Sequence, residues 1–150
     1  MRRPGGHKRG TSPRLMITGF LLAGLVFAAP AEAGEKLHIR LVLAHNDNEV
    51  VSKGLQDVKK TLVSNLPYTG FELLDQKKLS LPGGGKVELR HSIKLTASGT
   101  QDSLRVRVRH KRKPFVNTTL RLADGKPVIL GGIPSRPSRK GRVLVVIVAR

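Results

Sequence analysis

Residues 142–149 read RVLVVIVA, and this run indicates a β-strand that is buried on both faces. Successive side chains of a strand point to opposite faces, so the six consecutive apolar residues 143–148 leave neither face polar. Strands of this composition lie inside a sheet rather than at its solvent-exposed edge. We therefore expect residues 142–149 to form a central strand of the domain.

A second strand is predicted at residues 36–44, KLHIRLVLA, where apolar and polar residues alternate. This pattern is typical of a half-buried strand, with Lys36, His38 and Arg40 on the face away from the core. Further strands are predicted at residues 71–81, 86–95, 103–110, 115–122 and 127–130, separated by turns rich in Gly, Pro, Asp or Ser.

One helix is predicted between the first two strands, from about residue 48 to residue 64. Its apolar residues recur at spacings of four, three and four, which places them on one face of a helix. Asx residues at 46–48 offer an N-cap, and Pro67 ends the helix. Lys53 and Lys60 are expected on the solvent side, and the buried stripe comprises Val51, Leu55, Val58 and Leu62.

The order of elements predicts an α+β fold. One amphipathic helix would pack on a mostly antiparallel β-sheet, which would curl into a small sandwich or a partial barrel. The helix could also serve as a right-handed crossover between the first two strands. Residues 34–150 are long enough to form a single domain with one hydrophobic core.

Residues 1–33 have the composition of a secretory signal peptide. A basic segment without acids precedes the apolar run Leu15–Ala29, and Ala31-Glu32-Ala33 follows as a small-residue cleavage site. The alternative is an uncleaved membrane anchor, but the run is shorter than the ~20 residues that a spanning helix needs. We expect an exported protein, either periplasmic or secreted.

The first prediction is that the mature protein begins at Gly34. N-terminal sequencing of the exported protein measures this directly. An intact Met1 in the membrane fraction would contradict cleavage and support the anchor.

The charge of the chain favours anionic partners. The sequence has 28 Lys and Arg residues and 10 Asp and Glu residues; five of the bases and one acid lie in residues 1–33, which leaves 23 and nine and a formal charge of +14 on residues 34–150. Nucleic acid, lipopolysaccharide, anionic phospholipid and acidic polysaccharide are candidate partners. The absence of cysteine excludes disulfides, thiolate metal sites and thiol nucleophiles.

The sharpest local feature is a basic strand at residues 105–113, RVRVRHKRK. If the strand continues to its end, five cations share one face while Val106 and Val108 point to the core. Such a face could bind phosphate or carboxylate groups; the alternative is a solvated face that discourages edge-to-edge aggregation. The anion-binding candidates are Arg105, Arg107, Arg109, Lys111 and Lys113. Phe115 is the only aromatic nearby, so nucleic acid is the weaker choice among anions.

A second basic cluster lies in and beside the polar loop at residues 134–141. It could fold over an anionic ligand, or the loop could simply be mobile and polar. The candidate residues are Arg136, Arg139, Lys140 and Arg142.

No catalytic or metal-binding motif is found, and the sequence implies no cofactor and no small-molecule substrate. The histidines at 38, 45, 91 and 110 lack the spacing of a zinc site. The glycines at 83–85 precede a strand, whereas a phosphate-cradling loop leads into a helix.

Residues 118–134, TTLRLADGKPVILGGIP, resemble a strand-turn-strand element of bacterial secretins, and the strand at 144–150 resembles a later strand of those channels. The chain lacks a secretin's length and its repeated periplasmic modules, so we infer no pore, and the resemblance favours an envelope β-domain over an enzyme.

These observations lead us to expect a small exported bacterial envelope protein that acts as a non-enzymatic binding or structural module. The alternatives are a binder of anionic polymer (lipopolysaccharide, acidic polysaccharide or nucleic acid) through the basic strand, and a small hydrolase with an unrecognised site. Once the signal peptide is removed, the protein would not be an integral membrane protein.

Overall fold

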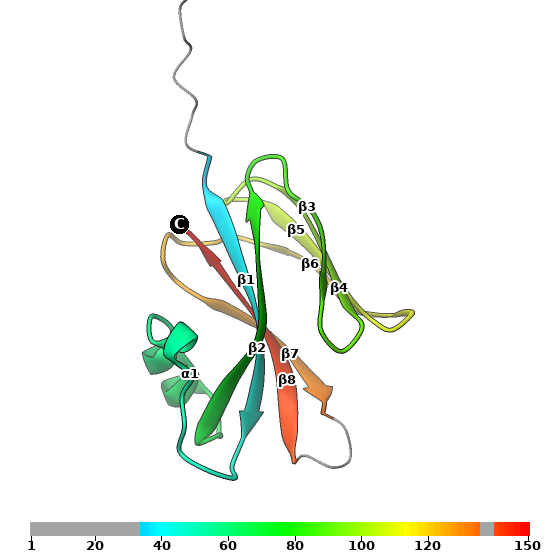
Figure 1. Cartoon of the computed structure of the whole chain (residues 1–150). Helices are drawn as coiled ribbons and strands as arrows, with labels where there is room; N and C mark the ends of the chain where they lie inside the picture. The colour runs from blue at the N-terminus through cyan, green and yellow to red at the C-terminus, as the bar shows by residue number, and fades with distance from the viewer. Residues whose placement is uncertain (1–33, 136–139) are drawn as a thin grey trace, which may run out of the picture. The chain divides into compact units, whose positions relative to one another are not determined.

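The computed structural model describes residues 34–135 and 140–150, which form eight strands in two antiparallel sheets. The described residues belong to one compact unit, Glu32–Arg150. The first sheet, sheet A, has the strand order β2-β1-β8-β7 (Figure 1). Its strands are β1 (Lys36–His45), β2 (Gly70–Ser80), β7 (Val128–Pro134) and β8 (Gly141–Ala149).

Sheet B has the order β3-β4-β5-β6, so each of its strands pairs with the next along the chain. These successive hairpins need only short turns, which the chain supplies at residues 90–92, 100–103 and 111–112. The strands are β3 (Gly85–Leu89), β4 (Ile93–Gly99), β5 (Leu104–His110) and β6 (Lys113–Leu120).

The prediction of mostly antiparallel β-structure with a helix is confirmed, and the sheets do not close into a barrel. The predicted central position of residues 142–149 is also confirmed, because β8 lies between β1 and β7. Seven of its nine residues, from Val143 to Ala149, are buried.

Two hydrophobic clusters lie on opposite faces of sheet A. The larger one, the inter-sheet core, joins inward residues of β1 and β8 to those of β4 and β5; it includes Leu37, Ile39, Leu41, Ile93, Leu95, Val106, Val108 and Ile147. The smaller one, the outer core, lies between sheet A and the helical segment; it includes Val42, Leu55, Val58, Leu62, Phe71, Leu144 and Val146. Figure 1 shows that segment beside one end of β1 and β2.

The helical segment is shorter than predicted and is divided in two. A 3₁₀ turn, η1 (Lys53–Leu55), is followed by α1 (Lys59–Asn65). The single helix over residues 48–64 is therefore wrong, and so is its cap at 46–48. The cause lies in β2: the Phe71 N–H donates to the carbonyl of Val50 and the Ser52 N–H to the carbonyl of Phe71, which holds residues 50–52 extended.

Gly54 allows this close approach of η1 to β2. A Cβ at Gly54 would lie 2.7 Å from Cδ2 of Leu73, closer than side-chain atoms pack. The predicted apolar stripe is nevertheless buried at Leu55, Val58 and Leu62, while Val51 is only partly buried. Lys53 and Lys60 are exposed, as predicted.

Three further predictions about the strands are wrong. β1 and β2 are antiparallel neighbours, so the helical segment is not a crossover. The strand predicted at 86–95 is the hairpin of β3 and β4, which turns at Arg90–Ser92 with positive φ at His91 and Ser92. β1 is not half-buried, because the helical segment covers part of its outer face and Arg40 is only 8% exposed.

Candidate functional site

A row of three arginines lies on the outer face of β5. Arg105, Arg107 and Arg109 are exposed, and they alternate with Val106 and Val108, which are fully buried in the inter-sheet core. The predicted inside and outside of this strand are therefore confirmed. Because alternate residues of an extended strand are about 7 Å apart, the three guanidinium groups are spaced along one line. We call them the arginine row.

Polar residues of the neighbouring strands flank the arginine row. Arg105 lies opposite Ser98 of β4 and Thr119 of β6, and Arg107 lies opposite Thr96 and Asn117. Paired residues share a face of the sheet, so hydroxyl and amide groups surround the arginines. The outer face of sheet B thus offers hydrogen-bond donors on both sides of a central cationic line.

Charge pairing on this face is limited. Among the described residues, Arg105 and Arg107 have no acidic partner, whereas Glu88 lies 2.6 Å from Nζ of Lys94 and the hydrogen bond from Lys94 lowers the pKa of that carboxyl. Arg109 donates from Nη2 to the carbonyl of Arg112 at 2.9 Å, which links it to the turn after β5. Two guanidinium groups are therefore available to an external anion.

An apolar side chain stands at the end of the arginine row. Phe115 is 40% exposed and follows Pro114, which lies opposite Arg109 across a β-bulge. A shallow hollow of about 620 Å³ opens beside it. Its lining residues are His110, Lys111, Arg112, Lys113, Pro114 and Phe115.

Lys111 and Lys113 do not continue the arginine row, and this part of the sequence prediction is wrong. β5 ends at His110, and Lys111 has a φ of 57°, which turns the chain into β6. Lys113 is the first residue of β6 and lies opposite His110. Both lysines are exposed at the turn, so they extend the positive charge around the hollow rather than along the strand.

The second predicted basic cluster is only partly described. Lys140 is exposed just before β8. Arg142 belongs to β8, as predicted for residues 142–149, and its Nη1 donates to the carbonyl of Gly132 in β7 at 3.1 Å. Arg136 and Arg139 lie outside the described residues. In the described part of the chain, the side chain of Arg142 therefore connects β8 to β7.

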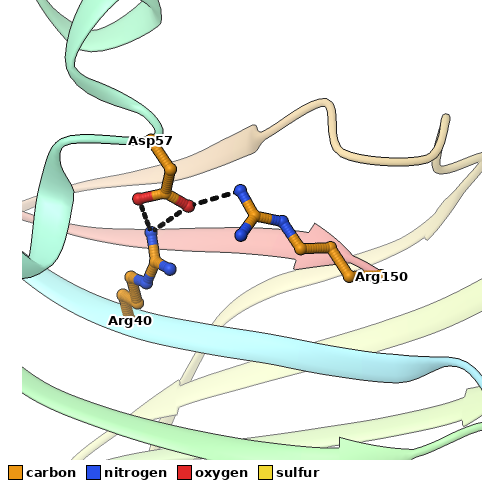
Figure 2. A network of polar contacts seen from close by, with 3 residues as sticks. All are labelled: Arg40, Asp57 and Arg150. Carbon is orange, nitrogen blue, oxygen red and sulfur yellow. Dashed lines mark hydrogen bonds and ion pairs between the residues drawn. The ribbon is translucent and has the colours of Figure 1, made fainter.

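A group of three charged residues that was not predicted from the sequence lies beside sheet A. Asp57, between η1 and α1, accepts two hydrogen bonds from Nη1 of Arg40 at 2.7 and 2.9 Å and one from Nη2 of Arg150 at 2.7 Å (Figure 2). Burial alone would raise the pKa of Asp57, but the hydrogen bond and charge of Arg40 and the charge of Arg150 hold that pKa below its ordinary value. We call these three residues the Asp57 clasp.

The clasp connects the helical segment to β1 and to the residue after β8. Its only sequence signal was weak: Arg40 and Arg150 flank apolar runs, and Asp57 is the single acid among the lysines of residues 53–60. Nothing in the order of residues indicates that these three would meet.

No three described His, Asp or Glu side chains are grouped so as to hold a metal ion. The described part of the chain also contains no helix with the length and apolar character needed to cross a bilayer. No protein-family model matches the chain, and comparisons with curated proteins and with solved structures found no significant match. Function must therefore be inferred from the surface chemistry of the domain itself.

Proposed function

We propose that this domain is a non-enzymatic module that binds an anionic polymer along the outer face of sheet B. The observation that carries the proposal is the arginine row, in which Arg105 and Arg107 are exposed and have no acidic partner among the described residues. Guanidinium groups bind phosphate, sulfate and carboxylate through paired N–H donors. A line of them suits a polymer better than a single small anion.

The scaffold supports this role. The inner residues of β5 belong to the inter-sheet core, so the arginines project from a strand whose position is fixed by packing. The sandwich-like arrangement that we propose for the two sheets would leave the outer face of sheet B free for contact. The formal charge of +14 on residues 34–150 would also steer polyanions toward the domain.

The composition of residues 1–33 extends the proposal to a small exported protein of a bacterial envelope. In that compartment the polymer would be lipopolysaccharide, an acidic polysaccharide or extracellular nucleic acid. All three polymers carry anionic groups, and the salt dependence of binding measures how much these groups contribute to the affinity.

The second prediction concerns the triple variant Arg105→Gln, Arg107→Gln, Arg109→Gln. It should retain the fold and change the free energy of unfolding by about 0.5 kcal/mol or less per substitution, because exposed side chains contribute little. Binding to heparin, lipopolysaccharide or single-stranded DNA should weaken and depend less on salt. For single-stranded DNA, each lost phosphate contact should make the plot of log binding constant against log salt concentration less steep by about 0.7.

A matched control removes the same charge elsewhere. Lys53, Lys59 and Lys60 are all exposed on the helical segment, so replacing them by Gln tests charge without touching sheet B. If both triple variants weaken binding equally, net charge rather than the arginine row carries the affinity. Unchanged binding in the arginine variant would reject the proposal outright.

A further inference from the structure

A second cationic cluster lies on the outer face of sheet A, beside the Asp57 clasp. His38 and Arg40 of β1 are opposite Lys78 and Gln76 of β2, respectively. Paired positions place side chains on the same face, with Cβ atoms about 5 Å apart. These four residues belong to a different sheet from the arginine row, so the cluster is independent of the proposed function.

The cluster borders a shallow surface hollow of about 290 Å³. The hollow is large enough for a phosphate group with its attached atoms, because a water molecule occupies roughly 30 Å³. Its lining residues are His38, Ile39, Arg40, Gln76, Lys77 and Lys78. Every lining residue except Ile39 therefore carries a polar or cationic side chain.

The charges around the hollow do not balance. Arg40, Lys78 and Arg150 are cationic, and Asp57 of the clasp opposes them. Burial lowers the pKa of His38, the charges of these three cations lower it further, and the charge of Asp57 raises it. All four charges thus act on the imidazole, and Lys77 adds a further positive charge to the lining of the hollow, so positive charge exceeds negative charge there.

Arg40 has donors that the clasp does not use. Both of its hydrogen bonds to Asp57 come from Nη1, which leaves the donors of Nη2 for a ligand, whereas its Nε is fully buried and has no partner within the described structure. Figure 2 shows the other nitrogens of this guanidinium facing away from Asp57. The side chain is only 9% exposed, so the helical segment and the sheet hold it in place beside the hollow.

We propose that this hollow is a binding site for a phosphate group, held by Arg40, Lys78, His38 and Gln76. A phosphate monoester carries nearly two negative charges at neutral pH, which suits the excess of positive charge around the hollow. It also accepts several hydrogen bonds, and the arginine, lysine, imidazole and amide groups all donate. A single carboxylate would leave most of this excess uncompensated.

The test is an NMR titration of the purified protein with inorganic phosphate at constant ionic strength. We expect saturable shifts at the amides of His38, Arg40, Gln76 and Lys78, and a rise in the pKa of His38, because a bound dianion stabilises the imidazolium. Lys78→Gln should weaken phosphate binding about tenfold or more, as expected for loss of a charged hydrogen-bond donor. Lys60→Gln, which removes the same charge from α1, should change it less than about twofold.

The arginine row provides a second comparison, because it could bind phosphate on its own. The triple arginine variant of sheet B should leave the His38 response unchanged. If phosphate shifts only sheet B, if the pKa of His38 does not change, or if Lys78→Gln and Lys60→Gln have equal effects, the site on sheet A is rejected.

The same resonances distinguish two sources of the phosphate. A soluble ester such as glycerol 3-phosphate represents a small ligand, and phosphatidylcholine bicelles with and without phosphatidic acid represent a lipid headgroup. If the His38 resonances shift with the soluble ester alone, the ligand is a small phosphate ester. If they shift with phosphatidic acid alone, the ligand is a lipid headgroup. A response to neither, despite binding of inorganic phosphate, would overturn a site for phosphate monoesters.

Discussion

Replacing Leu62 by alanine is expected to lower the free energy of unfolding by about 2–5 kcal/mol. Leu62 of α1 is fully buried in the outer core, together with Phe71 and Leu144 of sheet A. Truncation removes the transfer free energy of the lost methyl and methylene groups and leaves a cavity that the strands beneath cannot close. Chemical denaturation of both proteins measures the difference.

Val63→Ala is the matched control for this prediction. Val63 is the next residue of the same helix but is 49% exposed, so its truncation should change the free energy of unfolding by about 0.5 kcal/mol or less. A loss below about 1 kcal/mol for Leu62→Ala would show that α1 does not cover a true core.

The second large effect is expected for Asp57→Ala. Its side chain is 25% exposed and neutralises Arg40, whose side chain is 9% exposed. Removing one partner of a buried pair costs about 3–5 kcal/mol because the other charge is left uncompensated. Since Asp57 is partly solvated, we expect about 2–3 kcal/mol. Arg150→Ala, which leaves the contact between Arg40 and Asp57 intact, should cost about 1 kcal/mol or less.

A double-mutant cycle separates the ion pair from other effects of the substitutions. Arg40→Met combined with Asp57→Ala removes both charges, so the double variant should be more stable than the sum of the single effects predicts. Additive effects would mean that the two side chains are not energetically coupled.

The clasp also makes stability depend on acid. The folded-state pKa of Asp57 lies below its unfolded value, so its contribution is complete above the unfolded pKa of about 4. That contribution is lost as the pH falls through the folded pKa. Asp57→Asn should therefore reduce the slope of unfolding free energy against pH below about pH 4. The same slope in both proteins would contradict the assignment.

Parts of the candidate sites were predictable because they depend on local periodicity. The alternation of arginine and valine over 105–109 determined which side chains of β5 are buried, and the structure confirms it. The end of the row was not predictable in this way, because Lys111 and Lys113 keep the alternation although the chain turns between them. Alternation also failed to reveal the turn at Arg90–Ser92. Leu89 and Ile93 are direct partners across this turn, so they lie on the same face of the sheet, as they would in one continuous strand.

The sequence by itself determined the inward and outward faces of β5, the central place of β8 and the buried side chains of the helical segment. These features depend on whether a side chain is apolar, and burial of apolar surface selects the same face in any compatible fold. Tertiary structure alone decided that residues 50–52 run extended beside β2, that Arg40 is buried, and that Asp57 meets Arg150, 93 positions away. Those contacts arise when separate segments pack on sheet A, and no local pattern of residues specifies which charged groups that packing brings together.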